Sequence, residues 1–80
     1  MSDIVPIRVL DCSGLRCPIP LVKTNKTLKE IEVGQVLEMI STDPDSELDV
    51  EAWAKQTRHE LLAVNHGDDG AVHFLIRKTK

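Results

Sequence analysis

The alternation of two hydrophobic periods most restricts what this chain can fold into. Short stretches with the strand period of two alternate with longer stretches in which apolar residues recur every three or four positions. This pattern predicts strands at 7–11, 36–42, 60–65 and 71–77, and helices at 18–31 and 44–58. Helices between strands give parallel strand pairs with right-handed crossovers, whereas the glycine-containing turn at 67–70 makes the last two strands antiparallel.

Two helices are too few to cover both faces of a four-stranded sheet. We therefore expect an α/β (α+β) two-layer sandwich in the order β-α-β-α-β-β, with a four-stranded mixed sheet and both helices on one face. The 80 residues make one domain, 1–80. A chain this short buries roughly 60% of the surface that it exposes when unfolded. Any active site must therefore be shallow or completed by a partner.

The helix ends and helix faces give further expectations. In the first helix the core-facing residues are Leu21, Thr24, Asn25, Leu28 and Ile31, and Gly34 is expected just past the helix end. In the second helix Asp43 is the expected N-cap and Pro44 the first helical residue, and Asp49 is a candidate second cap that would separate the first turn. Its core-facing residues are Val50, Trp53, Ala54 and Thr57.

Apolar side chains fall on both faces of the expected sheet. In the second strand Val36, Glu38 and Ile40 alternate with Leu37, Met39 and Ser41, and the last strand alternates in the same way. The face without helices therefore keeps some apolar side chains. It is either a surface for a partner or a second copy, or it carries the scattered exposed apolar residues that are normal for any protein.

Composition narrows the class of function. The net charge is -3 and the aromatic residues are only Trp53 and Phe74, so the basic surface and stacking platforms of nucleic-acid binders are missing. No apolar run is long enough to span a membrane, and residues 1–6 lack the pattern of a signal peptide. We expect a cytoplasmic protein, a monomer by default, whose two cysteines, Cys12 and Cys17, are thiols.

The segment most informative about chemistry surrounds Cys17. Pro18 disfavours helical geometry at Cys17 and fits the first position of the helix that follows, so Cys17 is predicted to stand at the helix N-terminus. Free amides and the helix dipole at such a position favour a thiolate over a thiol, and Arg16 adds a cation. We therefore expect the pKa of the Cys17 thiol to lie below its ordinary value of about 8.5.

The neighbours of Cys17 refine this prediction. Neither Pro18 nor Pro20 has an N–H group, so the amide of Ile19 is the main first-turn donor left for the Cys17 sulfur. The two prolines also stiffen the turn, and Gly14 gives the preceding loop room to bend. A buried core cysteine has no need of this arrangement, although burial is the ordinary state of a free cysteine.

The run Leu10-Asp11-Cys12-Ser13-Gly14-Leu15-Arg16-Cys17-Pro18-Ile19-Pro20 resembles the signature of TusA-like (SirA-like) sulfur-carrier proteins. The resemblance continues beyond this run and so covers nearly the whole chain. It includes Lys23, Gly34, residues 42–44, Trp53, residues 59–61 and residues 75–78. It implies the same β-α-β-α-β-β fold and a persulfide on Cys17, with no separate cofactor. Cys12 departs from the pattern, because many relatives have alanine or another small residue there.

The resemblance also implies protein partners. Members of this family receive sulfur from a cysteine desulfurase, a rhodanese or another carrier, and deliver it toward tRNA thiolation, molybdenum-cofactor chemistry or oxidative sulfur metabolism. By analogy, Asp43 or Asp45 and basic residues such as Lys23 and Lys26 are candidate partner contacts. The lysines otherwise form a solvated helix face, or steer an acidic partner or an anionic donor such as thiosulfate toward Cys17.

Two other classes of function remain open on the sequence. A non-enzymatic adaptor would use the fold as a binding module, and a thiol redox protein would pair Cys17 with Cys12 as a second, resolving thiol. The Cys-x4-Cys spacing is not a usual zinc spacing, and the histidines at 59, 66 and 73 are scattered. We therefore predict no metal site.

Overall fold

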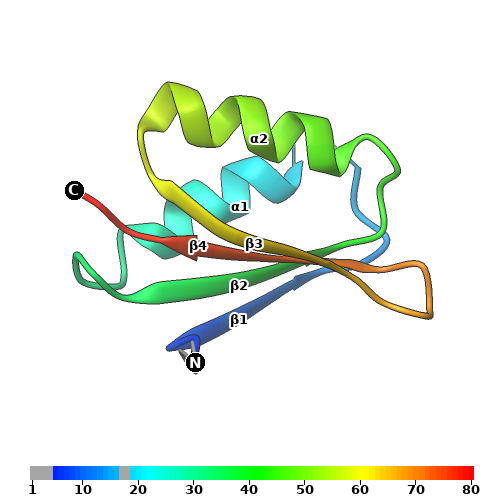
Figure 1. The fold of residues 1–80 in the computed structure, drawn as a ribbon, viewed down its shortest axis with the longest axis horizontal. Helices are drawn as coiled ribbons and strands as arrows, with labels where there is room; N and C mark the ends of the chain where they lie inside the picture. Colours follow the sequence, from blue (N-terminus) through cyan, green and yellow to red (C-terminus); the bar gives the residue numbers. More distant parts are fainter. Residues whose placement is uncertain (1–4, 17–18) are drawn as a thin grey trace.

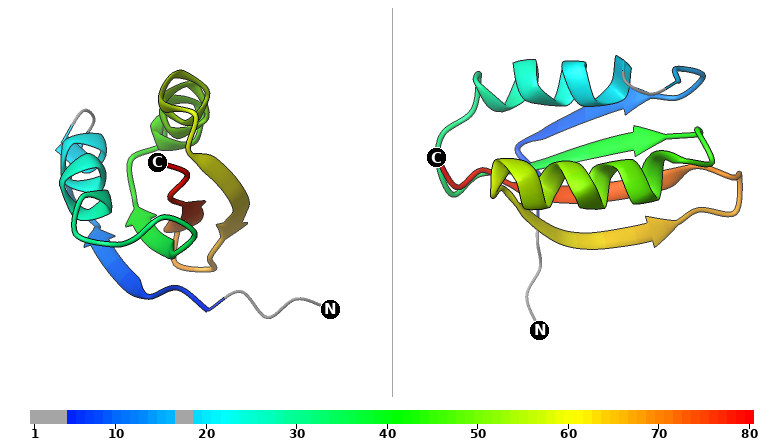
Figure 2. Two further views of the ribbon diagram at one scale, coloured as in Figure 1. Left: turned by 90° about the vertical axis from the view of Figure 1, so that its left-hand side faces the viewer. Right: turned by 90° about the horizontal axis from the view of Figure 1, so that it is seen from above.

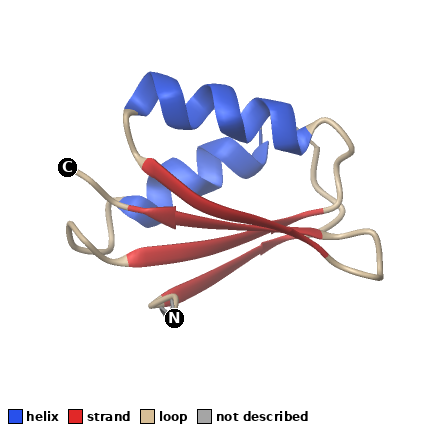
Figure 3. Cartoon of the chain, in the orientation of Figure 1, coloured by secondary structure: helices blue, strands red, loops and turns tan. Residues whose placement is uncertain are grey.

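A computed structural model describes residues 5–16 and 19–80 and shows two layers, a sheet with two helices on one of its faces (Figures 1 and 3). The elements are β1 (Arg8–Cys12), α1 (Ile19–Leu28), β2 (Val36–Ser41), α2 (Ser46–Thr57), β3 (Glu60–His66) and β4 (Val72–Arg77). The strand order is β1-β2-β4-β3, with β1 and β2 parallel and the other pairs antiparallel. The predicted fold class is confirmed.

The parallel pair fixes where both helices begin. β1 and β2 run side by side with Cys12 opposite Ser41, and each strand leads through a short loop into a helix. The first turns of α1 and α2 consequently lie at the same edge of the sheet (Figure 2, right). Any chemistry at the head of α1 therefore has the β2–α2 loop beside it.

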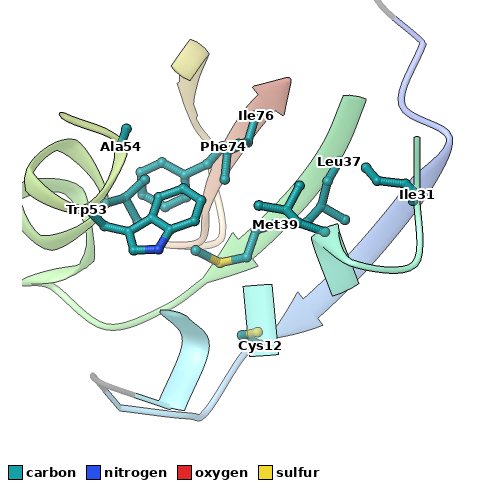
Figure 4. Packing of buried hydrophobic residues seen from close by; sticks show 10 residues of the cluster. Cys12, Ile31, Leu37, Met39, Trp53, Ala54, Phe74 and Ile76 are labelled. Atoms are coloured by element: carbon teal, nitrogen blue, oxygen red, sulfur yellow. The ribbon is translucent and has the colours of Figure 1, made fainter. Parts of the chain in front are cut away.

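The core lies between the helices and the sheet. Its fully buried side chains include Leu37, Met39, Phe74 and Ile76 from the sheet, which pack with Trp53 of α2 (Figure 4). Burial of each large apolar side chain stabilises the fold by about 1.5–3 kcal/mol. A hydrogen bond from Trp53 Nε1 to Asn25 Oδ1, 3.0 Å long, joins the two helices. The predicted core faces of the helices are thus largely correct, with Asn25 acting through this bond while remaining exposed.

The face of the sheet without helices is only partly apolar. Val9 is 60% exposed, whereas Ile40 and Leu75 are half-buried. Between them, His73 Nδ1 lies 2.8 Å from Glu38 Oε2, so a polar pair interrupts the apolar surface.

Helix α1 ends at Leu28, three residues earlier than predicted. The amides of Lys29, Glu30 and Ile31 bond to carbonyls three residues back rather than four, which tightens the chain out of the α-helix. Gly34 therefore does not follow the helix end directly. It has φ +92° in the turn before β2 and donates its N–H to the Lys78 carbonyl at 2.7 Å.

Helix α2 begins at Ser46, two residues later than predicted, and Asp45 rather than Asp43 precedes it. The carboxylate of Asp43 accepts the Asp45 N–H at 2.9 Å, which closes a local turn in place of a helix cap. Pro44 lies in this turn. Asp49 does not start a separate turn, because it lies inside α2 and its N–H bonds to the Asp45 carbonyl.

Candidate functional site

The loop after β1 is held by its own side chains. Asp11 accepts the Ser13 N–H at 2.9 Å, and hydrogen bonds from the Ser13 side chain and backbone hold the pKa of Asp11 below its usual range. Gly14 then adopts φ +81°, a conformation that L side chains rarely tolerate. We call residues 13–16 the first loop.

The loop after β2, residues 42–45, is the second loop and is fixed in a similar way. The Asp43 N–H donates to Ser41 Oγ at 3.2 Å, and the Ser46 N–H donates to the Asp43 carbonyl at 3.0 Å. The two loops are joined directly, because the Gly14 N–H donates to Thr42 Oγ1 at 2.8 Å. This bond holds the first loop against the loop that leads into α2.

The two loops enclose a pocket of about 480 Å³. The described residues that line it belong to the two loops: Gly14, Leu15, Arg16, Thr42, Asp43, Pro44 and Asp45. The first loop contributes a cation and the second loop two carboxylates. The structure thus brings together four of the predicted site residues, namely Gly14, Arg16, Asp43 and Asp45.

Cys17 and Pro18, the centre of the predicted site, lie outside the described residues. Before them in the chain, Arg16 lines the pocket. After them, Ile19 and Pro20 belong to the first turn of α1. Ile19 is 46% exposed and Pro20 is buried.

The Ile19 amide, predicted as a donor to the Cys17 sulfur, has an acceptor among the described residues. Its N–H donates to the Arg16 carbonyl at 3.0 Å. Cys17 lies outside the described residues, so the bond from this amide to its sulfur stays a prediction.

Three other predicted residues, Cys12, Lys23 and Lys26, are not among the residues that line the pocket. Lys23 and Lys26 are exposed on α1 and do not line the pocket. Cys12 is fully buried at the end of β1, beside α1 (Figure 4), and burial raises the pKa of its thiol. It is a free thiol held in its protonated form, which is a poor nucleophile.

Sequence reasoning missed Leu15, Thr42 and Pro44 as parts of the site. Their roles depend on the register that sets Cys12 beside Ser41, which places two loops 28 residues apart against each other. The threonine, aspartate and proline at 42–44 did carry a signal, since they belong to the family resemblance.

Two further features, a metal centre and a membrane-spanning helix, are absent from the described residues. Within 5–16 and 19–80, no three side chains of His, Cys, Asp or Glu gather in a way that could hold a metal ion. None of the helices described is both long and apolar enough for a membrane crossing.

Comparison with known proteins supplies the family. The sequence profile described as "Sulfurtransferase TusA" matches residues 8–78. The sulfur carrier protein TusA of Allochromatium vinosum is 49% identical over 70 residues, which cover 88% of this chain and 91% of that protein. The sulfur carrier protein TusA of Pseudomonas putida is 35% identical over 78 residues, 98% of this chain and 96% of that protein.

Other relatives are longer, and one solved structure supports the fold. The chain spans only 38% and 36% of the length of relatives from Aquifex aeolicus and Bacillus subtilis, to which it is 44% and 49% identical. A crystal structure of the SirA-like protein from Desulfitobacterium hafniense superposes with a TM-score of 0.80 at 23% identity, over 92% of this chain and all of that one. With a family profile that covers nearly all of its elements and near full-length relatives at this identity, the chain belongs to the TusA sulfurtransferase family.

Proposed function

We propose that this protein is a sulfur carrier that holds sulfane sulfur as a persulfide on Cys17 and passes it to another protein. The observation that carries the proposal is the position of Cys17 in the chain. Cys17 directly follows the pocket-lining Arg16 and precedes α1, inside the region that matches the TusA family. The sulfur travels covalently, so the proposal needs no bound cofactor.

The transfer is a balanced exchange between thiols. The Cys17 thiolate attacks the outer sulfur of a donor persulfide, the donor S–S bond breaks, and the donor leaves as a thiolate. The acceptor thiolate then repeats the same step on the Cys17 persulfide. Arg16 and the N-terminal end of α1 supply positive charge that favours the thiolate and the anionic persulfide in both steps. Such thiols persist in a reducing compartment, which supports the cytoplasm as the place of action.

The burial of Cys12 favours the carrier over a dithiol redox protein. A resolving thiol must reach the sulfur on Cys17 and must ionise to attack it. Cys12 has no exposed surface, packs in the hydrophobic core, and has a raised thiol pKa. Its chemistry suits a small core residue at the end of a strand.

Partner proteins supply and remove the sulfur in this proposal. A cysteine desulfurase or a rhodanese is the donor, and the acceptor serves tRNA thiolation, molybdenum-cofactor chemistry or oxidative sulfur metabolism. Exposed apolar side chains next to the site support docking, because Ile19 and Val22 are 46% and 62% exposed on α1. Lys23 and Lys26 lie on the same helix, and Asp43 and Asp45 lie across the pocket. These four charged residues are the proposed partner contacts.

Intact mass measurement tests the proposal. The wild type, Cys17→Ser and Cys12→Ser would each be incubated with a cysteine desulfurase plus cysteine, and separately with thiosulfate. We expect the mass of one sulfur atom to be added to the wild type and to Cys12→Ser, and not to Cys17→Ser. The donor that works would indicate the pathway.

Thermal melting supplies the control. Cys17→Ser should melt close to the wild type, because a residue at a helix start contributes little packing. If no donor loads the wild type, or if loading requires Cys12, the carrier proposal is wrong. An adaptor would load from neither donor, and a dithiol redox protein would fail when Cys12 is replaced.

A further inference from the structure

Two charged side chains in the pocket lining, Arg16 and Asp45, lack partners among the described residues. Among the described residues, neither the Arg16 guanidinium nor the Asp45 carboxylate makes a hydrogen bond or an ion pair. Both line the same pocket of about 480 Å³, yet they do not pair with each other. A cation and an anion held apart in one concave site suit a ligand that carries both charges.

Asp45 is available because it does not cap the helix that it precedes. It stands at the N-cap of α2 with φ -89° and ψ -3°, and its side chain makes no cap hydrogen bond. An N-cap aspartate normally accepts a first-turn N–H. Here the carboxylate makes no such bond, and Asp45 lines the pocket.

The balance of charge separates three kinds of small donor. Among the described lining residues, Asp43 and Asp45 carry negative charge and Arg16 carries positive charge. A dianion such as thiosulfate meets more negative than positive charge here. A purely cationic donor leaves Arg16 uncompensated. A zwitterion with neighbouring ammonium and carboxylate groups satisfies both sides of the pocket.

We propose that the pocket binds the α-amino-acid end of a free cysteine persulfide, with its carboxylate on Arg16 and its ammonium on Asp45, and so loads Cys17 without a protein donor. This inference rests on the proposed carrier function. In the reaction the Cys17 thiolate attacks the outer sulfur of the persulfide, the S–S bond of the donor breaks, and cysteine leaves as a thiolate that takes a proton from water. No oxidant or reductant is consumed. The volume lies in the range of small-molecule sites, about 300–1,000 Å³.

The test compares four small persulfides of the same chemistry and different charge. They are derived from cysteine (a zwitterion), 3-mercaptopropionate (an anion), cysteamine (a cation) and 2-mercaptoethanol (neutral). Loading of the full-length protein is followed by intact mass, and each variant's rate is divided by the wild-type rate for the same donor. This ratio removes the intrinsic reactivity of the donors.

The two substitutions should give different patterns. Arg16→Gln should slow loading from all four donors, because it removes a cation that favours the Cys17 thiolate. The cysteine and mercaptopropionate persulfides should lose about threefold more rate than the other two donors, which is the size of an exposed ionic contact. Asp45→Asn should slow loading from cysteine and cysteamine persulfides by a similar factor. Only the zwitterion should lose more rate than the neutral donor in both variants. Lys29→Gln and Asp68→Asn remove the same charges outside the pocket and should change none of the ratios.

The outcomes separate this inference from the proposed function. If Arg16→Gln and Asp45→Asn affect all four donors equally, or none of them, the binding mode is wrong even though Cys17 still loads from a desulfurase. If Cys17 loads from no donor of any kind, the carrier function itself fails.

Discussion

The two loops at the site are built alike and end differently. Each follows a parallel strand at a buried residue, Cys12 or Ser41, and each uses a side-chain oxygen to accept an N–H two residues later. The first loop then turns at Gly14 and leads to a cysteine flanked by a cation. The second loop turns at Pro44 and leads into a helix whose first turn is acidic.

The difference shows how one topology can serve two purposes. The second loop places its carboxylates where the positive end of α2 stabilises them, so its charge contributes to the stability of the fold. The first loop contributes no carboxylate and instead leads in the chain to Cys17, which becomes anionic in the proposed reaction. Thr42 and Gly14 join the loops, so a partner that contacts one loop also meets the charge of the other.

The largest effect should follow from reversing the charge on the α1 side. Lys23→Glu combined with Lys26→Glu should slow sulfur transfer with a protein partner by about tenfold at low salt, because charges at the rim of an interface mainly change the association rate. The difference should shrink at high salt, where exposed charges are screened. Transfer into and out of Cys17 would each be timed by intact mass.

Reversing the charge of two lysines outside the pocket lining is the matched control for that variant. Lys55→Glu with Lys80→Glu makes the same change in net charge away from the pocket lining. If both double variants slow transfer equally, net charge explains the effect and the α1 side has no special role. Asp45→Lys extends the comparison, since it reverses the charge on the second loop alone.

A smaller effect should follow from separating the two loops. Thr42→Val removes the acceptor of the Gly14 N–H and should lower the free energy of unfolding by about 1 kcal/mol, the usual net worth of one hydrogen bond. It should also slow loading of Cys17, because the first loop loses its hydrogen bond to the second loop. Urea denaturation and intact mass measure the two effects.

Thr27→Val is the control for this substitution. Its hydroxyl donates to the Lys23 carbonyl within α1, and neither residue belongs to the two loops. We expect a similar or smaller loss of stability and an unchanged loading rate. Equal loading by Thr42→Val and Thr27→Val would show that the tie between the loops does not matter for the reaction.

The same comparison explains what the sequence could predict. Periodicity was enough for the six elements, the mixed sheet and most of the core, because the apolar positions of α2 and β4 repeat at their own periods. The start of α2 was misplaced because the Asp43 carboxylate has two uses, a helix cap or a turn. Propensity does not distinguish them, whereas the bond to the Asp45 N–H does.

The site itself was only half predictable. Its residue types were visible in the first loop, since a cysteine followed by two spaced prolines is unusual in a core. The pocket was not, because it exists only when β1 and β2 pair in the register that sets Cys12 beside Ser41. The hydrogen bond from the Ile19 amide to the Arg16 carbonyl was not predictable for a related reason, because it depends on how the first loop turns.

The smallest effect should come from Ser46, the first residue of α2. Its Oγ is buried and has no hydrogen-bond partner among the described residues, a state that usually costs about 1–3 kcal/mol. Ser46→Ala removes the hydroxyl and installs the best helix former. The free energy of unfolding should therefore stay the same or rise by up to about 1 kcal/mol, with loading of Cys17 unchanged.

Ser41→Ala is the matched variant at the other end of the second loop. Ser41 is also buried, but its Oγ accepts the Asp43 N–H, so the same deletion removes a hydrogen bond and should cost about 1 kcal/mol. Two serines five residues apart should thus respond with opposite signs in urea denaturation. If Ser46→Ala destabilises the protein as much as Ser41→Ala does, the Ser46 hydroxyl has a partner in the folded protein, and α2 begins with a bond that the second loop must satisfy.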